Sequence, residues 1–339
     1  MYTTPPKKMI IINILDILKK YSDADHRLTQ QDILEILKKE YSMDVDRKTV
    51  KRNLMNLIDL DYDIEYTEIS RKDDRGNETS IYTDWYMHRE FTDSELRLLI
   101  DSVLFSKNIP HAHCKKLINK LAGLSNIYFT KKVNHICNLP ESQPENKELF
   151  YTINILDEAI SHNKKVAFTY NSYGPDKKLH PKRNAQYIVN PYQMVATNGR
   201  HYLICNYDKY DNISNYRIDH ITDIKLLDDS RKPMTTLDGG YFDLPKHMAE
   251  HIYMFSGKSV RVKFKAENSI IDQIIDWFGM DASIRKHNNE ECIIEVQVNK
   301  DAFFYWAMQY GLYIEVLEPA DVRQRLIDSI KRIEKKYNK

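Results

Sequence analysis

The sequence has 339 residues, of which 42% are hydrophobic and 29% charged, so it is neither a disordered nor a fibrous protein. At about 150 residues per domain, this length predicts two or three domains. Fifty lysines and arginines are balanced by 49 aspartates and glutamates, which excludes a protein that binds nucleic acid through bulk charge. Any such binding must use a local basic patch.

The N-terminus has some features of a signal peptide. Lys7 and Lys8 precede an apolar run that starts at Met9, but Asn13 and Asp16 interrupt it and no small-residue cleavage site follows. No stretch approaches the roughly 18 uncharged residues that a membrane span needs. The four cysteines form no CxxC pair. We therefore expect a protein of the reducing cytoplasm with no membrane partner.

Residues 7–60 predict three helices. On the first, one face carries the apolar residues Ile10, Ile14, Ile17 and Leu18. Thr29, followed three residues later by Asp32, is typical of the N-terminus of a second helix. The third begins near Asp46, and its apolar stripe consists of Val50, Leu54, Leu57 and Ile58.

A β-hairpin is predicted next. Apolar and polar residues alternate from Ile64 to Ile69 and again from Ile81 to Trp85, on both sides of the polar tip RKDDRGNE. Three helices followed by a hairpin is the order of a winged helix-turn-helix domain, which we assign to residues 1–88.

The third helix carries candidate DNA-binding residues. Its apolar stripe faces inward, which leaves cationic and small polar side chains facing outward, where they could reach phosphates and base edges. The candidates are Arg47, Lys48, Thr49, Lys51, Arg52 and Asn56 on the helix, and Arg71, Lys72 and Arg75 at the hairpin tip. The alternative is a solvated face of mixed charge, because residues 1–86 carry 14 basic and 17 acidic groups.

Residues 89–146 predict a helical linker. One apolar stripe holds Leu96, Leu99, Ile100 and Val103, and a second holds Cys114, Leu117, Ile118 and Leu121. The run LPESQPEN at 139–146 predicts a connection between domains. A soft-metal cluster could draw on His111, His113, Cys114, His135 and Cys137. The position of Cys114 on the apolar stripe favours a buried core thiol instead.

Residues 147–230 predict one helix and then closely spaced short strands. The close spacing of these strands and turn residues such as Asn198-Gly199 favour a small barrel or strongly bent sheet over a layered α/β domain. Aromatic and cationic residues interleave here, which suits stacking and phosphate contacts. The candidate ligand-binding residues are Tyr170, Arg200, His201, Tyr202, Arg217 and His220. The alternative is that these residues have a structural role, in which Arg217 forms an ion pair with Asp219 or Asp223.

The last third begins with a connecting segment, residues 231–257. Residues 258–339 then follow the order β-α-β-β-α-β with a closing helix, which predicts a ferredoxin-like domain. In the connecting segment, His247, Glu250 and His251 have the spacing of an inverted zinc-peptidase motif. Surface histidines on a connecting helix are the simpler interpretation, and a zinc-dependent hydrolase is the less favoured alternative.

Other catalytic signatures do not occur in the sequence. It contains no GxSxG, no phosphate loop of the GxxxxGK type and no GxGxxG. We therefore expect no enzymatic activity and no cofactor.

Three segments resemble one family of bacterial transcription regulators. NGRHYLICNYDKYDNISNYRIDHI resembles the signature of the WYL domain, an Sm-like barrel. VDRKTVKRNLMNLI resembles the helix-turn-helix that precedes this domain, and IEVLEPADVRQRLIDSIKRIEKKY resembles the WCX extension that follows it. Tyr202 and Leu203 match the family pattern, but His201 stands where the family has Trp and His220 where an Arg is common. Both replacements titrate near neutral pH.

The resemblance covers nearly the whole chain. It implies an α+β multidomain protein with a winged helix-turn-helix, a helical linker, an Sm-like β-barrel and a ferredoxin-like C-terminal domain. It also implies a DNA-binding transcription regulator whose barrel senses an anionic effector, a nucleotide or single-stranded nucleic acid. The resemblance assigns ligand binding to Tyr202 and Arg217. It assigns it also to His201 and His220, which stand where the family has other residues.

Two further expectations concern assembly and an alternative function. One recognition helix covers half of a symmetric double-stranded DNA operator, so we expect a homodimer. The alternative is an accessory protein whose barrel binds single-stranded DNA or RNA and whose helix-turn-helix serves assembly.

Overall fold

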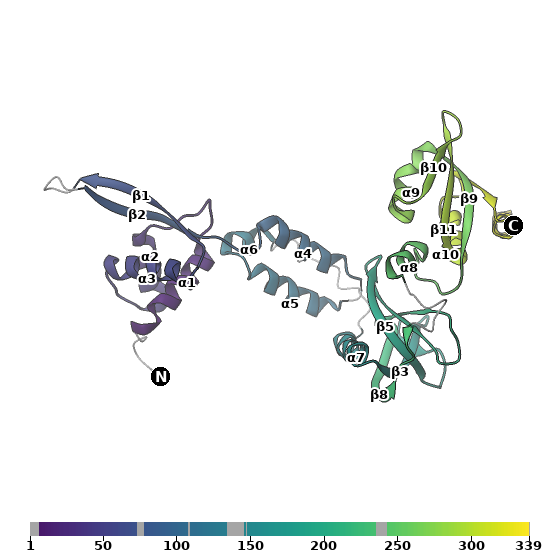
Figure 1. Ribbon diagram of the computed structural model, residues 1–339, viewed down its shortest axis with the longest axis horizontal. Helices are drawn as coiled ribbons and strands as arrows, with labels where there is room; N and C mark the ends of the chain where they lie inside the picture. Colours follow the sequence, from purple (N-terminus) through teal and green to yellow (C-terminus); the bar gives the residue numbers. More distant parts are fainter. Residues whose placement is uncertain are drawn as a thin grey trace. The chain divides into compact units, whose positions relative to one another are not determined.

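The structure is a computed structural model, and it describes residues 7–72, 78–107, 109–133, 146, 148–234 and 243–338. The chain divides into two compact units, Met1–Glu145 and Asn146–Lys339. Each unit has hydrophobic cores of its own. Figure 1 shows the elements from which the units are built.

The first unit begins with three helices and a hairpin. After a 3-10 turn, the elements are α1 (Ile10–Tyr21), α2 (Gln30–Tyr41), α3 (Arg47–Asp59), β1 (Ile64–Lys72) and β2 (Glu78–Met87). Thr29 and Asp32 form the predicted capping box at the start of α2. The Asp46 carboxylate accepts a hydrogen bond from the Thr49 N–H at the start of α3. Both predicted helix starts are confirmed.

One core joins these helices to the hairpin. The predicted stripe of α1 and all of the predicted stripe of α3 except the half-buried Ile58 are buried in it, together with the fully buried Trp85 of β2. Trp85 and Leu28 also exchange two backbone hydrogen bonds of 2.8 Å, which fixes β2 beside the segment that leads into α2. Because one face of α3 is used in this core, its opposite face lies outward.

Three more helices complete the described part of the first unit. They are α4 (Asp93–Phe105), α5 (His111–Ala122) and α6 (Ile127–Val133). Leu96, Ile100 and Cys114 are buried as predicted. The placement of Leu99 on the same buried stripe is wrong, since it is 40% exposed. Leu99 lies about 60° around the helix from Leu96, on the side away from Ile100.

Contacts at the end of α1 hold α6 to the three-helix part. The Asn126 side-chain amide donates to the Asp23 carboxylate at 2.5 Å, and the rings of His26 and Tyr128 stack with centroids 3.6 Å apart. Two members of the soft-metal cluster considered from the sequence, His135 and Cys137, lie outside the described residues.

The second unit opens with α7 (Leu149–Ser161) and a six-stranded antiparallel sheet. The strands are β3 (Lys164–Tyr173), β4 (Leu179–Pro181), β5 (Tyr187–Thr197), β6 (Arg200–Asn206), β7 (Ser214–Arg217) and β8 (Ile221–Ser230). Their order is β4-β3-β5-β6-β7, and β8 pairs with β3. Register shifts in β3 and β5 bend these strands. The sheet is curled, and α7 packs against β3, β5 and β8. The Sm-like barrel stays a prediction.

The remainder of the second unit is a second α+β assembly. A short helix, α8 (Leu244–Glu250), precedes β9 (Ser259–Glu267), α9 (Ile271–Phe278), β10 (Ser283–Lys286), β11 (Glu291–Asn299), α10 (Lys300–Gln309), β12 (Ile314–Glu318) and α11 (Ala320–Tyr337). This is the predicted β-α-β-β-α-β succession. The sheet order β10-β11-β9-β12 places the first and third strands in the centre.

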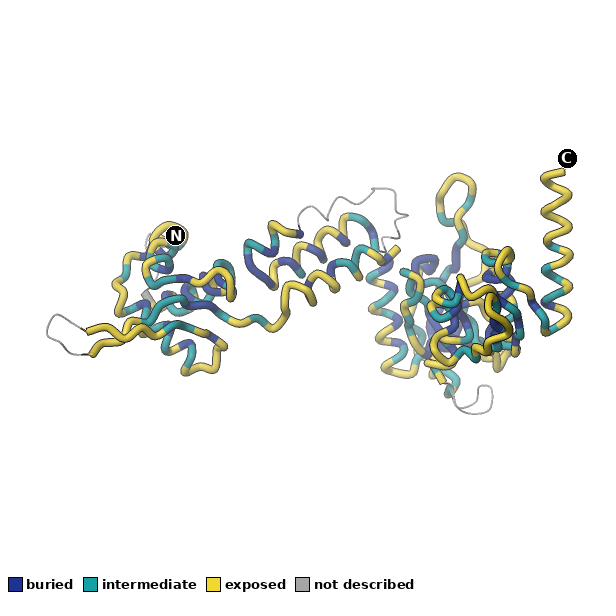
Figure 2. Tube along the Cα trace, turned by 90° about the horizontal axis from the view of Figure 1, so that it is seen from above, coloured by how far each residue is buried: buried dark blue, intermediate teal, exposed yellow. Residues whose placement is uncertain are grey.

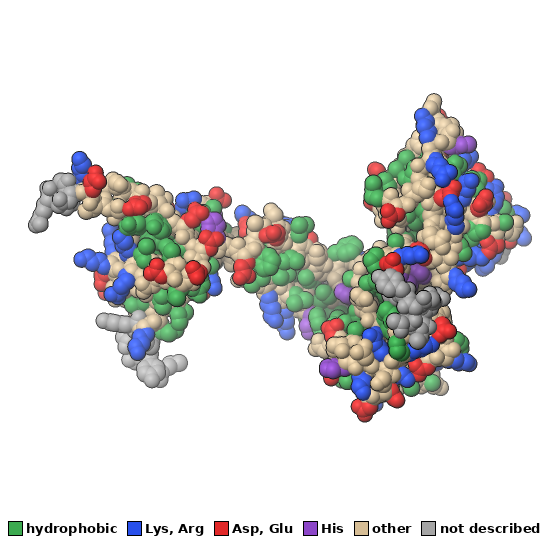
Figure 3. Space-filling view, viewed as in Figure 1, with side chains coloured by type: hydrophobic (Ala, Val, Ile, Leu, Met, Phe, Trp, Pro, Cys, Tyr) green, Lys and Arg blue, Asp and Glu red, His purple; other side chains and the backbone are tan. Residues whose placement is uncertain are grey.

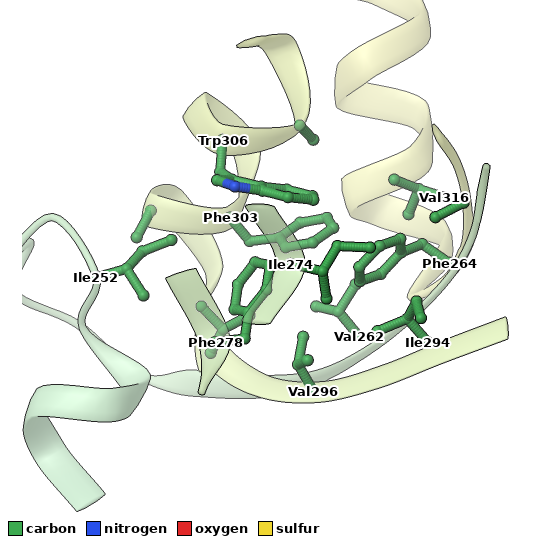
Figure 4. Packing of buried hydrophobic residues seen from close by; sticks show 14 of the residues in the cluster. Ile252, Val262, Phe264, Ile274, Phe278, Ile294, Val296, Phe303, Trp306 and Val316 are labelled. Atoms are coloured by element: carbon green, nitrogen blue, oxygen red, sulfur yellow. The ribbon is translucent and has the colours of Figure 1, made fainter. Parts of the chain in front are cut away.

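Aromatic rings fill the core between this sheet and its helices. Phe264 of β9 contacts Phe303 and Trp306 of α10, with ring centroids 5.4 and 5.5 Å apart, and Phe278 of α9 closes the cluster (Figure 4). The core uses only the start of α11: Val322 is buried, whereas every residue from Ile330 to Tyr337 is exposed (Figure 2).

Candidate functional site

The outward face of α3 is the first candidate site. Lys48, Arg52 and Asn56 are exposed on the side of the helix away from its buried stripe, and Arg47 is exposed at the N-terminus of the helix. Figure 3 shows Lys and Arg side chains gathered on the three-helix part below the hairpin. Exposed cations on a helix whose other face is anchored in a core can reach a phosphate backbone without disturbing the fold.

Several candidates on α3 already have partners within the protein. Lys51 is half-buried, and its ammonium lies 3.7 Å from the ring centroid of Tyr82 on β2, a cation–π contact. Arg47 donates to the Gln31 side chain at 3.0 Å. The Thr49 hydroxyl donates to Asp46 at 3.1 Å, so it is part of the helix cap. Lys51, Arg47 and Thr49 therefore hold α3 in place through contacts within the protein, in addition to their predicted role in DNA binding.

The hairpin supplies the remaining DNA-binding candidates. Arg71 and Lys72 are exposed at the end of β1, where they pair in register with Thr79 and Glu78. Arg75 lies outside the described residues. At the first turn of α3, the hydrogen bond from the backbone N–H of Thr49 lowers the pKa of the Asp46 carboxylate. This carboxylate is therefore ionised at neutral pH, next to the cations Arg47 and Lys48.

The second candidate site is centred on Asp219, in the short turn between β7 and β8. Arg217 donates to its carboxylate through Nε (3.1 Å) and Nη2 (2.5 Å). The Nη1 atom of Arg200 and the Nε2 atom of His220 lie 3.9 and 3.8 Å from the same carboxylate oxygen, Oδ2. Three predicted ligand-binding residues thus converge on one carboxylate. The predicted structural pairing of Arg217 with Asp219 is also present.

Aromatic rings border this cluster. The Tyr170 hydroxyl accepts the backbone N–H of Arg217 at 3.3 Å, and burial raises its pKa to about 12. Tyr202 on β6 lies opposite Arg217 in the register of the sheet. Tyr173 contacts the His220 ring edge-on, with centroids 5.4 Å apart. A bound base or sugar would therefore meet aromatic surface beside the two arginines.

Three members of this site are not among the six candidate ligand-binding residues, although Tyr173 and Lys182 belong to the aromatic and cationic group that the sequence indicates. Asp219 was considered only as a structural partner, although it is the group on which the cluster is built. Tyr173 and Lys182 border His220 and Tyr170, with the Lys182 ammonium 5.1 Å from the Tyr170 ring centroid. All three lie in the aromatic and cationic segments, so the composition signal was present. Their mutual placement depends on the pairing of β3 with β8 and is not a local pattern.

The two histidines of the site are uncharged in the free protein at neutral pH. His220 is 9% exposed, and its Nδ1 lies 3.0 Å from the backbone carbonyl oxygen of Asn171. A carbonyl only accepts, so Nδ1 carries the proton and Nε2 is left as an acceptor. Burial lowers the pKa of His220 and likewise that of His201. Neither His220 Nε2 nor His201 Nδ1 has a hydrogen-bond partner among the described residues.

The His247-Glu250-His251 motif does not lie on the surface. His247 and His251 are both buried, and their rings stack with centroids 3.9 Å apart. The two nitrogens of His251 contact the carbonyl oxygens of His247 (2.9 Å) and Gly257 (3.2 Å). The interpretation as surface histidines is wrong, because contacts made in the folded unit bury the pair. Across the described ranges, no three His, Cys, Asp or Glu side chains are grouped to hold a metal ion.

A further observation concerns membranes. No described helix combines the length and the apolar character needed to cross a bilayer.

Comparison with known proteins identifies two domains. Residues 151–226 match the WYL domain family, and residues 258–333 match the WCX domain family. No curated protein matches the sequence.

Two solved structures are similar to the chain. One is proteasome accessory factor B/C (PafBC) of Arthrobacter aurescens, with 12% identity, 95% of this chain covered and a TM-score of 0.30. This chain covers 48% of that protein, about half of its length. The other is a CRISPR Cas-related protein, with 15% identity, 100% of this chain and 88% of the other covered, and a TM-score of 0.42.

Proposed function

Because this chain belongs to the WYL-domain regulator family, with a WYL domain followed by a WCX domain, we propose that it is a transcription regulator whose DNA binding responds to a phosphate-bearing ligand. The observation that carries the DNA-binding part is the exposed cationic face of α3, which includes Lys48 and Arg52. The buried stripe on the other side of α3 holds this face outward. The helix then acts as the recognition helix of a winged helix-turn-helix, and the hairpin lies against the backbone.

The ligand-sensing part rests on the cluster around Asp219. Arg200 and Arg217 offer guanidinium groups to phosphate oxygens, and Tyr173 and Tyr202 offer aromatic surface to a base, whereas the buried Tyr170 supports Arg217. Binding shifts the protein toward the arrangement that the ligand prefers, and DNA affinity changes with it. Two copies of the chain read the two halves of a symmetric operator. The proposal assigns no catalytic step to any residue.

The first prediction tests α3. We expect the triple variant Lys48→Ala, Lys51→Ala, Arg52→Ala to bind duplex DNA of mixed sequence more weakly and with a shallower salt dependence. Each lost phosphate contact removes about 0.9 from the slope of log K against log salt, so the slope falls by about 2 to 3. Fluorescence anisotropy at several salt concentrations measures both quantities.

A matched control separates this surface from general charge. Lys115, Lys116 and Lys120 are exposed on α5 in the same unit, and their triple alanine variant changes the net charge equally. This variant should keep the wild-type slope. Equal losses in the two variants, or no loss in either, would remove α3 as the DNA-binding element.

The aromatic and cationic cluster around Asp219 also supports one alternative function. The protein would then be an accessory protein whose main role is to bind single-stranded DNA or RNA. The same titration with single-stranded oligonucleotides discriminates between the two functions. A regulator prefers the duplex, and the α3 variant loses that preference. An accessory protein prefers the single strand, and the α3 variant keeps that preference for single-stranded oligonucleotides.

A further inference from the structure

His220 has an unusual hydrogen-bonding position for a buried side chain. Its Nδ1 donates to the Asn171 carbonyl, and its Nε2 lies 3.8 Å from Oδ2 of Asp219, which is too long for a hydrogen bond. With Nε2 unprotonated, two acceptors face each other. A buried polar atom without a partner is costly, and a proton on Nε2 would remove this cost.

Charged and titratable groups surround His220 on every side. Asp219 favours the protonated ring, whereas Arg217 and Lys182 disfavour it. Arg200 is a further cation, 3.9 Å from the Asp219 carboxylate, and the rings of Tyr170 and Tyr173 lie against His220 without charge. Burial is the largest influence and keeps the ring neutral in the free protein. A small change in local charge is therefore sufficient to change its protonation.

A phosphate monoester supplies such a change. Arg200, Arg217 and Asp219 together carry a net charge of +1, whereas a terminal phosphate carries about −1.5 to −2 at neutral pH. Binding beside the two arginines leaves the cluster with excess negative charge. The nearest neutral base is His220, and an added anion raises the pKa of an imidazole.

We propose that His220 takes up a proton when a terminal phosphate monoester binds beside Arg200 and Arg217, so that ligand affinity increases as the pH falls. This inference rests on the proposed function and adds the regulation of its ligand site. The protonated Nε2 donates to the phosphate or to Asp219, where the neutral ring can donate to neither. A nucleotide and the 5′ end of a nucleic acid both present this group.

Isothermal titration calorimetry of the full-length protein tests the proposal. The probes are thymidine 5′-monophosphate and oligothymidylate with and without a 5′-phosphate, each titrated in two buffers of different ionisation enthalpy. We expect net uptake of up to one proton near neutral pH, and affinity that rises by up to about tenfold per unit decrease in pH. Uptake with the mononucleotide alone identifies a small-molecule effector. Uptake with the phosphorylated oligomer as well identifies a nucleic-acid end.

Two variants at position 220 separate charge from packing. His220→Gln retains a donor for the Asn171 carbonyl but cannot be protonated, so its binding should be weaker and its proton uptake lost. His220→Arg carries a permanent charge, and it should bind the monophosphate without proton uptake. The matched control His180→Gln removes an exposed histidine of the same unit that pairs with Asp176, and it should behave as wild type.

Each remaining outcome decides between the two proposals. Phosphate binding without proton uptake, or uptake that persists in His220→Gln, overturns the role of His220 while the proposed function stands. Loss of uptake in His201→Gln but not in His220→Gln moves the role to His201 and likewise overturns it. Failure of all three probes to bind overturns the phosphate sensor together with this inference. The α3 titration with duplex DNA reports separately on the regulator.

Discussion

Buried and half-buried histidines distinguish the second unit at the level of single residues. His201, His220 and His247 all have a lowered pKa, and burial is the largest cause in each case. His247 is affected most strongly, since burial and the neighbouring His251 lower its pKa to about 4. Its Nε2 lies 3.3 Å from the side-chain oxygen of Asn215 on β7, so this histidine joins α8 to the curled sheet. Its role in this structure is to hold two elements together.

This position predicts a specific loss of stability in acid. The unfolded chain protonates His247 as the pH falls through about 6.5, whereas the folded protein resists protonation until about pH 4. The free energy of unfolding therefore decreases across this window, by about 2 to 3 kcal/mol from this residue, and no further below it. Urea unfolding of wild type and His247→Gln at several pH values measures the difference.

Between pH 6.5 and 4, the free energy of unfolding of His247→Gln should decrease less than that of wild type. Exposed His162 on the same unit provides the control, and His162→Gln should follow the wild-type curve. Parallel curves for wild type and His247→Gln would mean that His247 is protonated in the folded protein and contradict its lowered pKa.

At the scale of elements, α3 combines a structural cap with the cationic face proposed to bind DNA. Asp46 caps the helix through the Thr49 N–H, and the same carboxylate is the acidic group next to Arg47 and Lys48. The cap requires a side-chain oxygen and not a charge, because Asn and Asp serve almost equally well at this position. A phosphate backbone at the first turn, in contrast, responds to the charge.

We therefore expect Asp46→Asn to leave the unfolding midpoint nearly unchanged and to strengthen duplex DNA binding by about two- to fivefold at low salt. Asp46→Ala removes the cap as well, so it should lower the unfolding midpoint. Thermal unfolding and anisotropy titrations of the two variants measure the two effects separately. Equal DNA affinity in wild type and Asp46→Asn would place the first turn of α3 away from the phosphates.

Elements with local signals could be predicted from the sequence, and contacts between elements could not. The Thr29–Asp32 capping box and the buried stripes of α1 and α3 follow from spacing within one helix. The burial of His247, the contact of Lys51 with Tyr82 and the convergence on Asp219 depend on which strands and helices pack together. For Leu99, which lies at the edge of an apolar stripe, spacing alone does not predict burial, because burial there depends on the position of the neighbouring helix.

For the whole molecule, the proposed function requires the second unit to act on DNA binding by the first. Asn146 is the first residue of the second unit, and it is buried. Its side-chain amide donates to the backbone carbonyls of Asp219 (2.9 Å) and Ile221 (3.0 Å), the two residues that flank His220. The start of the second unit is thus bonded directly to the turn of the candidate ligand site. On the proposed function, a movement of this turn on ligand binding reaches Asn146 through these two hydrogen bonds.

This connection predicts that Asn146→Ala uncouples the two sites while leaving both able to bind. In wild type, the factor by which thymidine 5′-monophosphate changes DNA affinity must equal the factor by which DNA changes monophosphate affinity, commonly about 5- to 150-fold. Asn146→Ala should bring both factors close to one and keep each separate affinity near wild type. Asn268→Ala is the control, since Asn268 also donates to a backbone carbonyl, that of Asn289, but lies outside this turn. Full coupling in Asn146→Ala would show that the signal leaves the ligand site by a route other than the β7–β8 turn.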